Sequence, residues 1–169
     1  DLANIKIAKE MGVTGVMQPF VRDHSDLECV KEALREAGAE DIRLFAKIEN
    51  MDGVRKLEKL LPAADEIVIA RGDLGNAVHL WDLPGVQRQI SEKCRAAGKP
   101  FMVVTQMLAS MERSPVPTRA EVNDIFHAVM DGAASIMVTG ETAVGDYPVE
   151  VIRYMVNTVR SAEKKKIDK

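Results

Sequence analysis

The chain has 169 residues, of which 46% are apolar, 29% charged and 4% aromatic, and its formal net charge is −3. This length and apolar content fit one domain with a substantial core. The nearly balanced charge argues against a nucleic-acid surface or a polybasic membrane contact. No apolar run approaches the length of a membrane span, and the first ten residues hold no signal-peptide core, so we expect a cytoplasmic protein.

The predicted elements alternate between helix and strand along the chain. A first helix over 3–11 precedes five short runs of β-branched and other apolar residues, which predict buried strands over 15–20, 44–48, 67–70, 101–104 and 136–138. Helix start and stop signals predict further helices over 25–37, over 83–97, from the Thr118 capping box to about 131, and from Pro148 onwards. Strand centres recur at intervals of roughly 22 to 35 residues, which is typical of βα units. The predicted fold class is α/β with parallel strands.

Polar side chains follow each predicted strand. In a parallel sheet or barrel the loops after the strands converge on one face, where functional groups gather. The residues at these positions are Arg22, Lys47, Glu49, Arg71, Asp73, Thr105, Gln106, Thr139 and Glu141. These residues are therefore the candidates for a functional site.

Lys47 and Glu49 are two residues apart on one strand, so both side chains point the same way. One interpretation is an ion pair at the rim of a barrel, since a buried charge needs a partner. The other adds Asp73: two carboxylates from neighbouring strand ends can hold a hard divalent cation such as Mg²⁺. Lys47 would then face developing negative charge. The residues alone leave both interpretations open.

The segment from Ala70 to Gly75 reads ARGDLG and follows a predicted strand directly. Its glycines let the backbone approach an anion, and a helix beginning there would present N–H groups to a carboxylate or phosphate. An ordinary glycine-rich βα turn is the alternative. An adhesive role for the RGD tripeptide does not fit a barrel loop without disulfides.

The remaining reactive side chains give no site of their own. Cys29 and Cys94 belong to no CxxC pair, and both are predicted to be core thiols. The three histidines, His24, His79 and His127, share no metal-site or triad spacing. Trp81, within an apolar stretch over 80–83, predicts either core anchoring or a subunit contact.

Several motifs together resemble the pyruvate kinase family. They are KIEN at 47–50, ARGDLG at 70–75, GKP at 98–100, TQMLASM at 105–111, PTRAE at 117–121, GETA at 140–143 and YPVE at 147–150. They occur in the family's order and spacing, and the similarity runs from about residue 8 to residue 163. The combination is far more specific than any single motif.

The resemblance implies phosphoryl transfer from phosphoenolpyruvate to ADP, giving pyruvate and ATP in glycolysis. It implies that Glu49 and Asp73 are ligands of Mg²⁺ or Mn²⁺ and that Lys47 is the catalytic cation, in contact with the substrate. Gly72 and Asp73 would bind the substrate carboxylate through their backbone N–H groups, and the Thr105 hydroxyl would contact the substrate near the carbon that gains a proton. Arg71 and Glu141 would be supporting residues.

This chain departs from the family pattern at three places. Pro19 stands where the family has Ser before the first Phe, and Thr139 stands where Ser is common. After Gly75 the sequence is NAVHLW, where the family reads like VEIP. These changes put the rim of the site in doubt and leave its metal and substrate motifs in place.

The resemblance also implies that 1–169 is a partial barrel domain, with about five of the eight strands of a TIM-type (β/α)8 barrel. The first strands, an inserted lid domain, a C-terminal regulatory domain and the family's K⁺ ligands would lie outside this chain. Open barrel edges or helices would then favour self-association. We expect the isolated chain to be inactive, and the alternative function is an inactive half-barrel acting as a structural or binding module. A different enolate-forming barrel, which also holds Mg²⁺ with two acids, is disfavoured by TQM and PTRAE.

Overall fold

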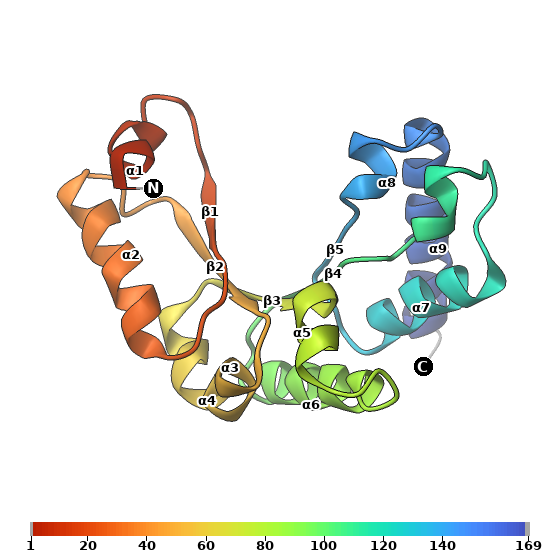
Figure 1. The fold of residues 1–169 in the computed structure, drawn as a ribbon, viewed down its shortest axis with the longest axis horizontal. Helices are drawn as coiled ribbons and strands as arrows, with labels where there is room; N and C mark the ends of the chain where they lie inside the picture. The colour runs from red at the N-terminus through yellow and green to blue at the C-terminus, as the bar shows by residue number, and fades with distance from the viewer. Residues whose placement is uncertain (1, 168–169) are drawn as a thin grey trace. The chain divides into compact units, whose positions relative to one another are not determined.

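The computed structural model describes residues 2–167, which divide after Pro100 into two compact units. The first unit contains α1 (Leu2–Ala8), β1 (Gly15–Gln18), α2 (His24–Glu36), β2 (Arg43–Ile48), α3 (Met51–Arg55), α4 (Leu57–Leu60), a 3-10 turn η1 (Leu61–Ala63), β3 (Glu66–Ala70), α5 (Arg71–Ala77) and α6 (Leu83–Ala96). The second contains β4 (Phe101–Val104), a 3-10 turn η2 (Ala109–Glu112), α7 (Arg119–Met130), β5 (Ser135–Met137), α8 (Gly140–Ala143) and α9 (Pro148–Ile167). Figure 1 shows this alternation of strand and helix.

Parallel pairing organises the strands within each unit. In the first, β1 pairs with β2 and β2 with β3, with Lys47 opposite Val68 and Ile48 opposite Ile69. In the second, β4 pairs with β5. The α/β class with parallel strands is therefore confirmed, and all five predicted strands are present within the described residues.

Strand β2 buries one face more deeply than the other. Leu44, Ala46 and Ile48 are buried, whereas Phe45 and Lys47 on the opposite face stay partly accessible. Every residue of β3 is buried, as its continuous apolar run predicts. Burying each large aliphatic side chain contributes about 1.5–3 kcal/mol. The buried face therefore holds β2 in position, and Lys47 lies on the more accessible face of the strand.

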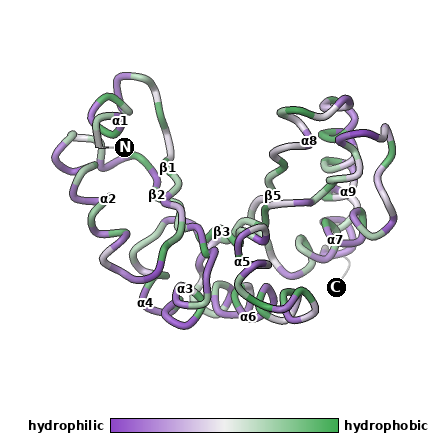
Figure 2. The backbone as a smooth tube through the Cα atoms, in the orientation of Figure 1, coloured by the Kyte–Doolittle hydropathy of each residue, from purple (hydrophilic) through white to green (hydrophobic). Residues whose placement is uncertain are grey.

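The helices begin and end near their predicted signals. Thr118 and Glu121 form the predicted capping box at the start of α7. Gly38, Gly98 and Gly132 follow α2, α6 and α7 with positive φ angles of 61°, 62° and 98°, a conformation that glycine adopts without a Cβ penalty. In Figure 2, hydrophilic and hydrophobic residues are interspersed along α6, which buries Ile90, Ser91 and Cys94.

The end of the first strand and the burial of Cys29 need correction. The first strand ends at Gln18 and not at residue 20, because Pro19 lacks an N–H and Phe20 has a left-handed φ of 52°. Cys29 is exposed, since it lies outside the face of α2 that buries Leu27 and Leu34; Cys94 is buried, as predicted. Burial raises the pKa of the Cys94 thiol to about 12.

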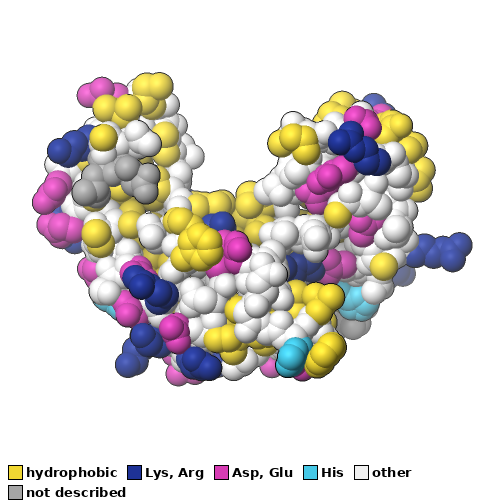
Figure 3. Space-filling view, viewed as in Figure 1, with side chains coloured by type: hydrophobic (Ala, Val, Ile, Leu, Met, Phe, Trp, Pro, Cys, Tyr) yellow, Lys and Arg dark blue, Asp and Glu magenta, His cyan; other side chains and the backbone are white. Residues whose placement is uncertain are grey.

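The surface shown in Figure 3 carries interspersed acidic and basic side chains. Many of them pair locally, as Arg88 does with Glu92 along α6. Among residues 2–167, no helix is both long enough and apolar enough to span a membrane.

Candidate active site

The end of β2 holds a buried carboxylate paired with a lysine. Lys47 Nζ lies 2.7 Å from Glu49 Oε1, and the two side chains are 26% and 1% exposed. The backbone N–H of Phe20 donates to Glu49 Oε2 at 2.6 Å. The alternation that predicted a shared direction for Lys47 and Glu49 is confirmed, and each carboxylate oxygen of Glu49 has one partner. This geometry holds the carboxylate in a defined orientation.

Asp73 lies just beyond the end of the neighbouring strand. Because Ile48 pairs with Ile69, the ends of β2 and β3 share one edge of the sheet, and α5 begins directly after Ala70. Figure 1 shows this short helix following β3. Asp73 is exposed in the first turn of α5. Gly72 and Asp73 are among the first residues of the helix, whose N–H groups have no partner within the helix itself.

Arg71, the first residue of α5, points towards the following helix. Its Nη1 lies 3.5 Å from Gln87 Oε1 of α6, which is a long hydrogen bond, and it makes a further polar interaction. The guanidinium thus ties α5 to α6.

The donor set at this edge fits a hard divalent cation. A carboxylate has about four lone-pair sites, so the two hydrogen bonds to Glu49 leave capacity for a metal ion. Mg²⁺ is commonly bound by one or two carboxylates, with waters and substrate phosphates as its other ligands. Within residues 2–167, no group of three or more His, Cys, Asp or Glu side chains is arranged to hold a metal. A cation held by Glu49 and Asp73 would need further oxygen ligands, such as water or phosphate.

In the second unit, Thr105 directly follows β4 in an uncommon conformation. Thr105 and Gln106 have φ angles of 80° and 54°, and neither is glycine. Each such residue costs about 1–3 kcal/mol and persists only when its surroundings hold it. Thr105 and Gln106 each make a further interaction. The next two residues, Met107 and Leu108, are fully buried. The turn that presents Thr105 is therefore held in place by its neighbours.

Glu141 is one of the groups that hold this turn. Its carboxylate, in a residue only 2% exposed, accepts the N–H of Leu108 at 3.2 Å and that of Thr139 at 2.8 Å. The first bond ties the segment after β4 to the start of α8.

A second carboxylate, Glu121, holds the same segment further on. Besides capping α7, it accepts the N–H and the hydroxyl of Ser110 at 2.7 and 2.6 Å. Burial alone would raise the pKa of Glu121, but the hydrogen bonds from Ser110 and Thr118 outweigh it and lower the pKa. The sequence predicted the cap; it gave no signal for the bond to Ser110, which lies before the helix.

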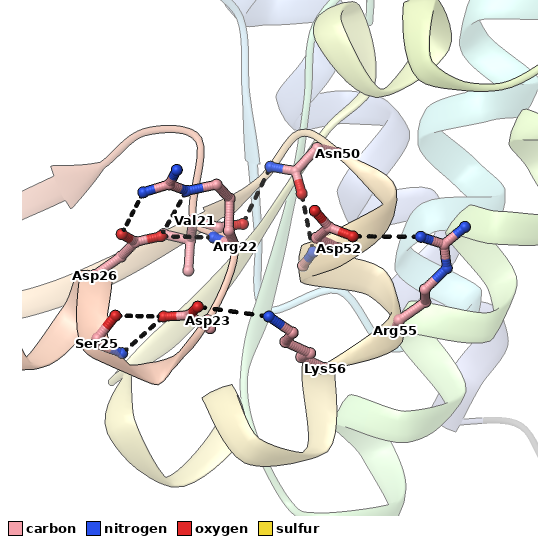
Figure 4. Close-up of polar contacts among 10 residues, drawn as sticks. Val21, Arg22, Asp23, Ser25, Asp26, Asn50, Asp52, Arg55 and Lys56 are labelled. Atoms are coloured by element: carbon pink, nitrogen blue, oxygen red, sulfur yellow. Dashed lines mark hydrogen bonds and ion pairs between the residues drawn. The ribbon is translucent and has the colours of Figure 1, made fainter.

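Arg22, the candidate after the first strand, forms a local ion pair. Arg22 pairs with Asp26 through two side-chain hydrogen bonds at 3.3 and 3.0 Å (Figure 4). Hydrogen bonding to Arg22 lowers the pKa of the Asp26 carboxyl.

Trp81 is 77% exposed, and its ring stacks on that of His79 with the ring centroids 4.7 Å apart. The loop that carries Trp81 therefore lies on the surface, and the predicted anchoring role is wrong for this chain.

Comparison with known proteins places these features in a family. The model of the family described as "Pyruvate kinase, barrel domain" matches residues 1–152. The chain is 43% identical to the pyruvate kinases of Bacillus licheniformis and Dictyostelium discoideum over 163 residues, which is 96% of this chain and 28% and 32% of those proteins. It is 42% identical to that of Clostridium acetobutylicum over 148 residues, 88% of this chain and 31% of that protein.

The chain therefore spans about a third or less of the length of these relatives. The family match covers both units and includes every residue considered above for the site. This chain belongs to the pyruvate kinase family, and it corresponds to part of the family's barrel domain.

Proposed function

We propose that this chain supplies the metal-binding and catalytic residues for phosphoryl transfer from phosphoenolpyruvate to ADP, giving pyruvate and ATP. The observation that carries the proposal is the buried Glu49 carboxylate held beside Lys47 at a strand end, in a chain of this family. In the reaction, the bond between phosphorus and the enol oxygen breaks and a bond to the terminal phosphate of ADP forms. The enolate left behind then takes up a proton at carbon.

Each of these residues would have a defined part in the reaction. Glu49 and Asp73 hold Mg²⁺ or Mn²⁺, which when bound neutralises phosphate charge. Lys47 has three N–H donors and uses one on Glu49, so it can also face the transferred phosphoryl group and the enolate oxygen. The N–H groups of Gly72 and Asp73 bind the substrate carboxylate, with Arg71 supporting their helix. Thr105, held through Glu141, contacts the carbon that is protonated; its assignment rests on the family resemblance.

Metal binding provides the first test. Replacing Glu49 with glutamine should weaken Mn²⁺ binding to the chain at least about tenfold, because the substitution removes a charged ligand and keeps the acceptor for Phe20. Electron paramagnetic resonance of free Mn²⁺ during a titration measures this affinity. Glu36→Gln, on the exposed end of α2, is the matched control and should bind as the unmodified chain does. Equal affinities in the unmodified and Glu49→Gln chains would contradict the proposed site.

We also propose that the chain self-associates. In the described residues β1 pairs with β2 on one side and with no strand on the other, and such an open edge favours pairing with another chain. Light scattering at micromolar concentration should detect dimers or larger species. A monodisperse monomer would refute this part of the proposal.

A further inference from the structure

The residue after Glu49 bridges two segments of the first unit. Asn50 Oδ1 accepts the N–H of Gly53 at 2.9 Å and so caps α3, while Asn50 Nδ2 donates to the carbonyl oxygen of Val21 at 3.2 Å. Figure 4 shows the Asn50 side chain between Val21 and the start of α3. Each polar end of the amide thus has its own partner.

The segment that Asn50 holds is the one that contacts Glu49. Phe20 donates its N–H to Glu49 Oε2 at 2.6 Å, and Val21 donates its N–H to the carbonyl oxygen of Lys47 at 3.2 Å. Phe20 has a φ of 52°, which is costly for a non-glycine residue by about 1–3 kcal/mol. Without contacts from neighbouring residues, the backbone at Phe20 would move to a less costly conformation. The Phe20 N–H would then turn away from the Glu49 carboxylate.

Gly53 shows how closely this segment packs. A Cβ at residue 53 would lie 2.6 Å from the Val21 carbonyl oxygen, closer than atoms can approach. The carbonyl therefore rests against the first turn of α3, within reach of the Asn50 amide. Val21 itself is fully buried, so no water replaces the amide as its partner without rearrangement.

We infer that Asn50 is a positioning residue for the divalent cation: it holds Phe20 and Val21 so that the Phe20 N–H fixes one oxygen of Glu49 while Lys47 fixes the other. The inference rests on the proposed function for the role of Glu49 as a metal ligand. Groups that orient a metal ligand typically change metal affinity by about 10–100-fold when they are lost. Asn50 acts in this way through Phe20, without touching the metal.

The substitution Asn50→Ser separates the two functions of the amide. Serine keeps an oxygen that caps a helix about as well as asparagine, so the melting temperature should change little. It loses the N–H that reaches Val21. We expect Mn²⁺ affinity, measured by electron paramagnetic resonance, to fall by about tenfold. The exposed Asn157→Ser on α9 is the control and should bind Mn²⁺ normally.

Hydrogen exchange of the Phe20 amide, followed by NMR in the absence of metal, tests the positioning step by itself. Exchange should be several-fold faster in Asn50→Ser than in the unmodified chain, and Asn50→Asp, which also keeps the cap oxygen, should show the same change. Unchanged Mn²⁺ affinity in a Mn²⁺-binding chain, or unchanged Phe20 exchange, would overturn the inference. If the unmodified chain binds no Mn²⁺, the proposed function fails, and Phe20 exchange alone decides whether Asn50 positions Glu49.

Discussion

Replacing Lys47 with methionine should lower ATP formation by roughly 10²–10³-fold, the loss typical when one group that stabilises transition-state charge is removed. The setting for this measurement is a chimera in which residues 1–152 replace the matching segment of the Bacillus licheniformis pyruvate kinase, which is 43% identical to this chain. Methionine has a similar length but no charge. A coupled assay that follows pyruvate through an NADH-linked dehydrogenase reports the rate.

Lys56→Met is the matched control for this substitution. Lys56 is exposed and pairs with Asp23 at 3.4 Å. Because exposed ion pairs contribute little energy, its loss should leave the rate within about twofold. A Lys47→Met chimera that folds and keeps the rate of its unmodified counterpart would remove Lys47 from the catalytic role.

The second large effect concerns stability. Replacing Glu141 with alanine should lower the free energy of unfolding by about 3 kcal/mol or more, because the N–H groups of Leu108 and Thr139 lose a charged acceptor in a buried place. Glu141→Gln, which keeps an acceptor oxygen, should cost less. Urea unfolding followed by circular dichroism measures the difference.

Glu163→Ala, an exposed change on α9, provides the baseline and should stay within about 0.5 kcal/mol of the unmodified chain. If Glu141→Ala unfolds at the same urea concentration as this control, the two bonds contribute nothing measurable. The turn after β4 that presents Thr105 would then be held by other contacts.

Much of the fold was predictable because buried parallel strands leave a strong mark on the sequence. The run over 67–70 is apolar throughout, and β3 is buried throughout. The strand over 44–48 alternates in burial, which correctly indicated that Lys47 and Glu49 share a direction. Helix ends were predictable where a glycine or a capping box marks them.

The hydrogen bonds that hold the site were less predictable. Phe20, Thr105 and Gln106 have left-handed backbones, and no residue type there signals this conformation, since none is glycine. The bonds from Phe20 to Glu49 and from Leu108 to Glu141 both depend on such turns. Cys29 and Trp81 show a related limit: residue type favours burial, but the surrounding packing decides it.

Catalysis by the residues of this segment can be measured directly. The most direct test is the coupled assay on the chimera that contains unmodified residues 1–152. We expect Mg²⁺-dependent ATP formation that exceeds the rate of the Lys47→Met chimera by roughly 10²–10³-fold. A chimera that folds, as judged by a cooperative thermal transition, and binds Mn²⁺ but forms no ATP from phosphoenolpyruvate and ADP would contradict it.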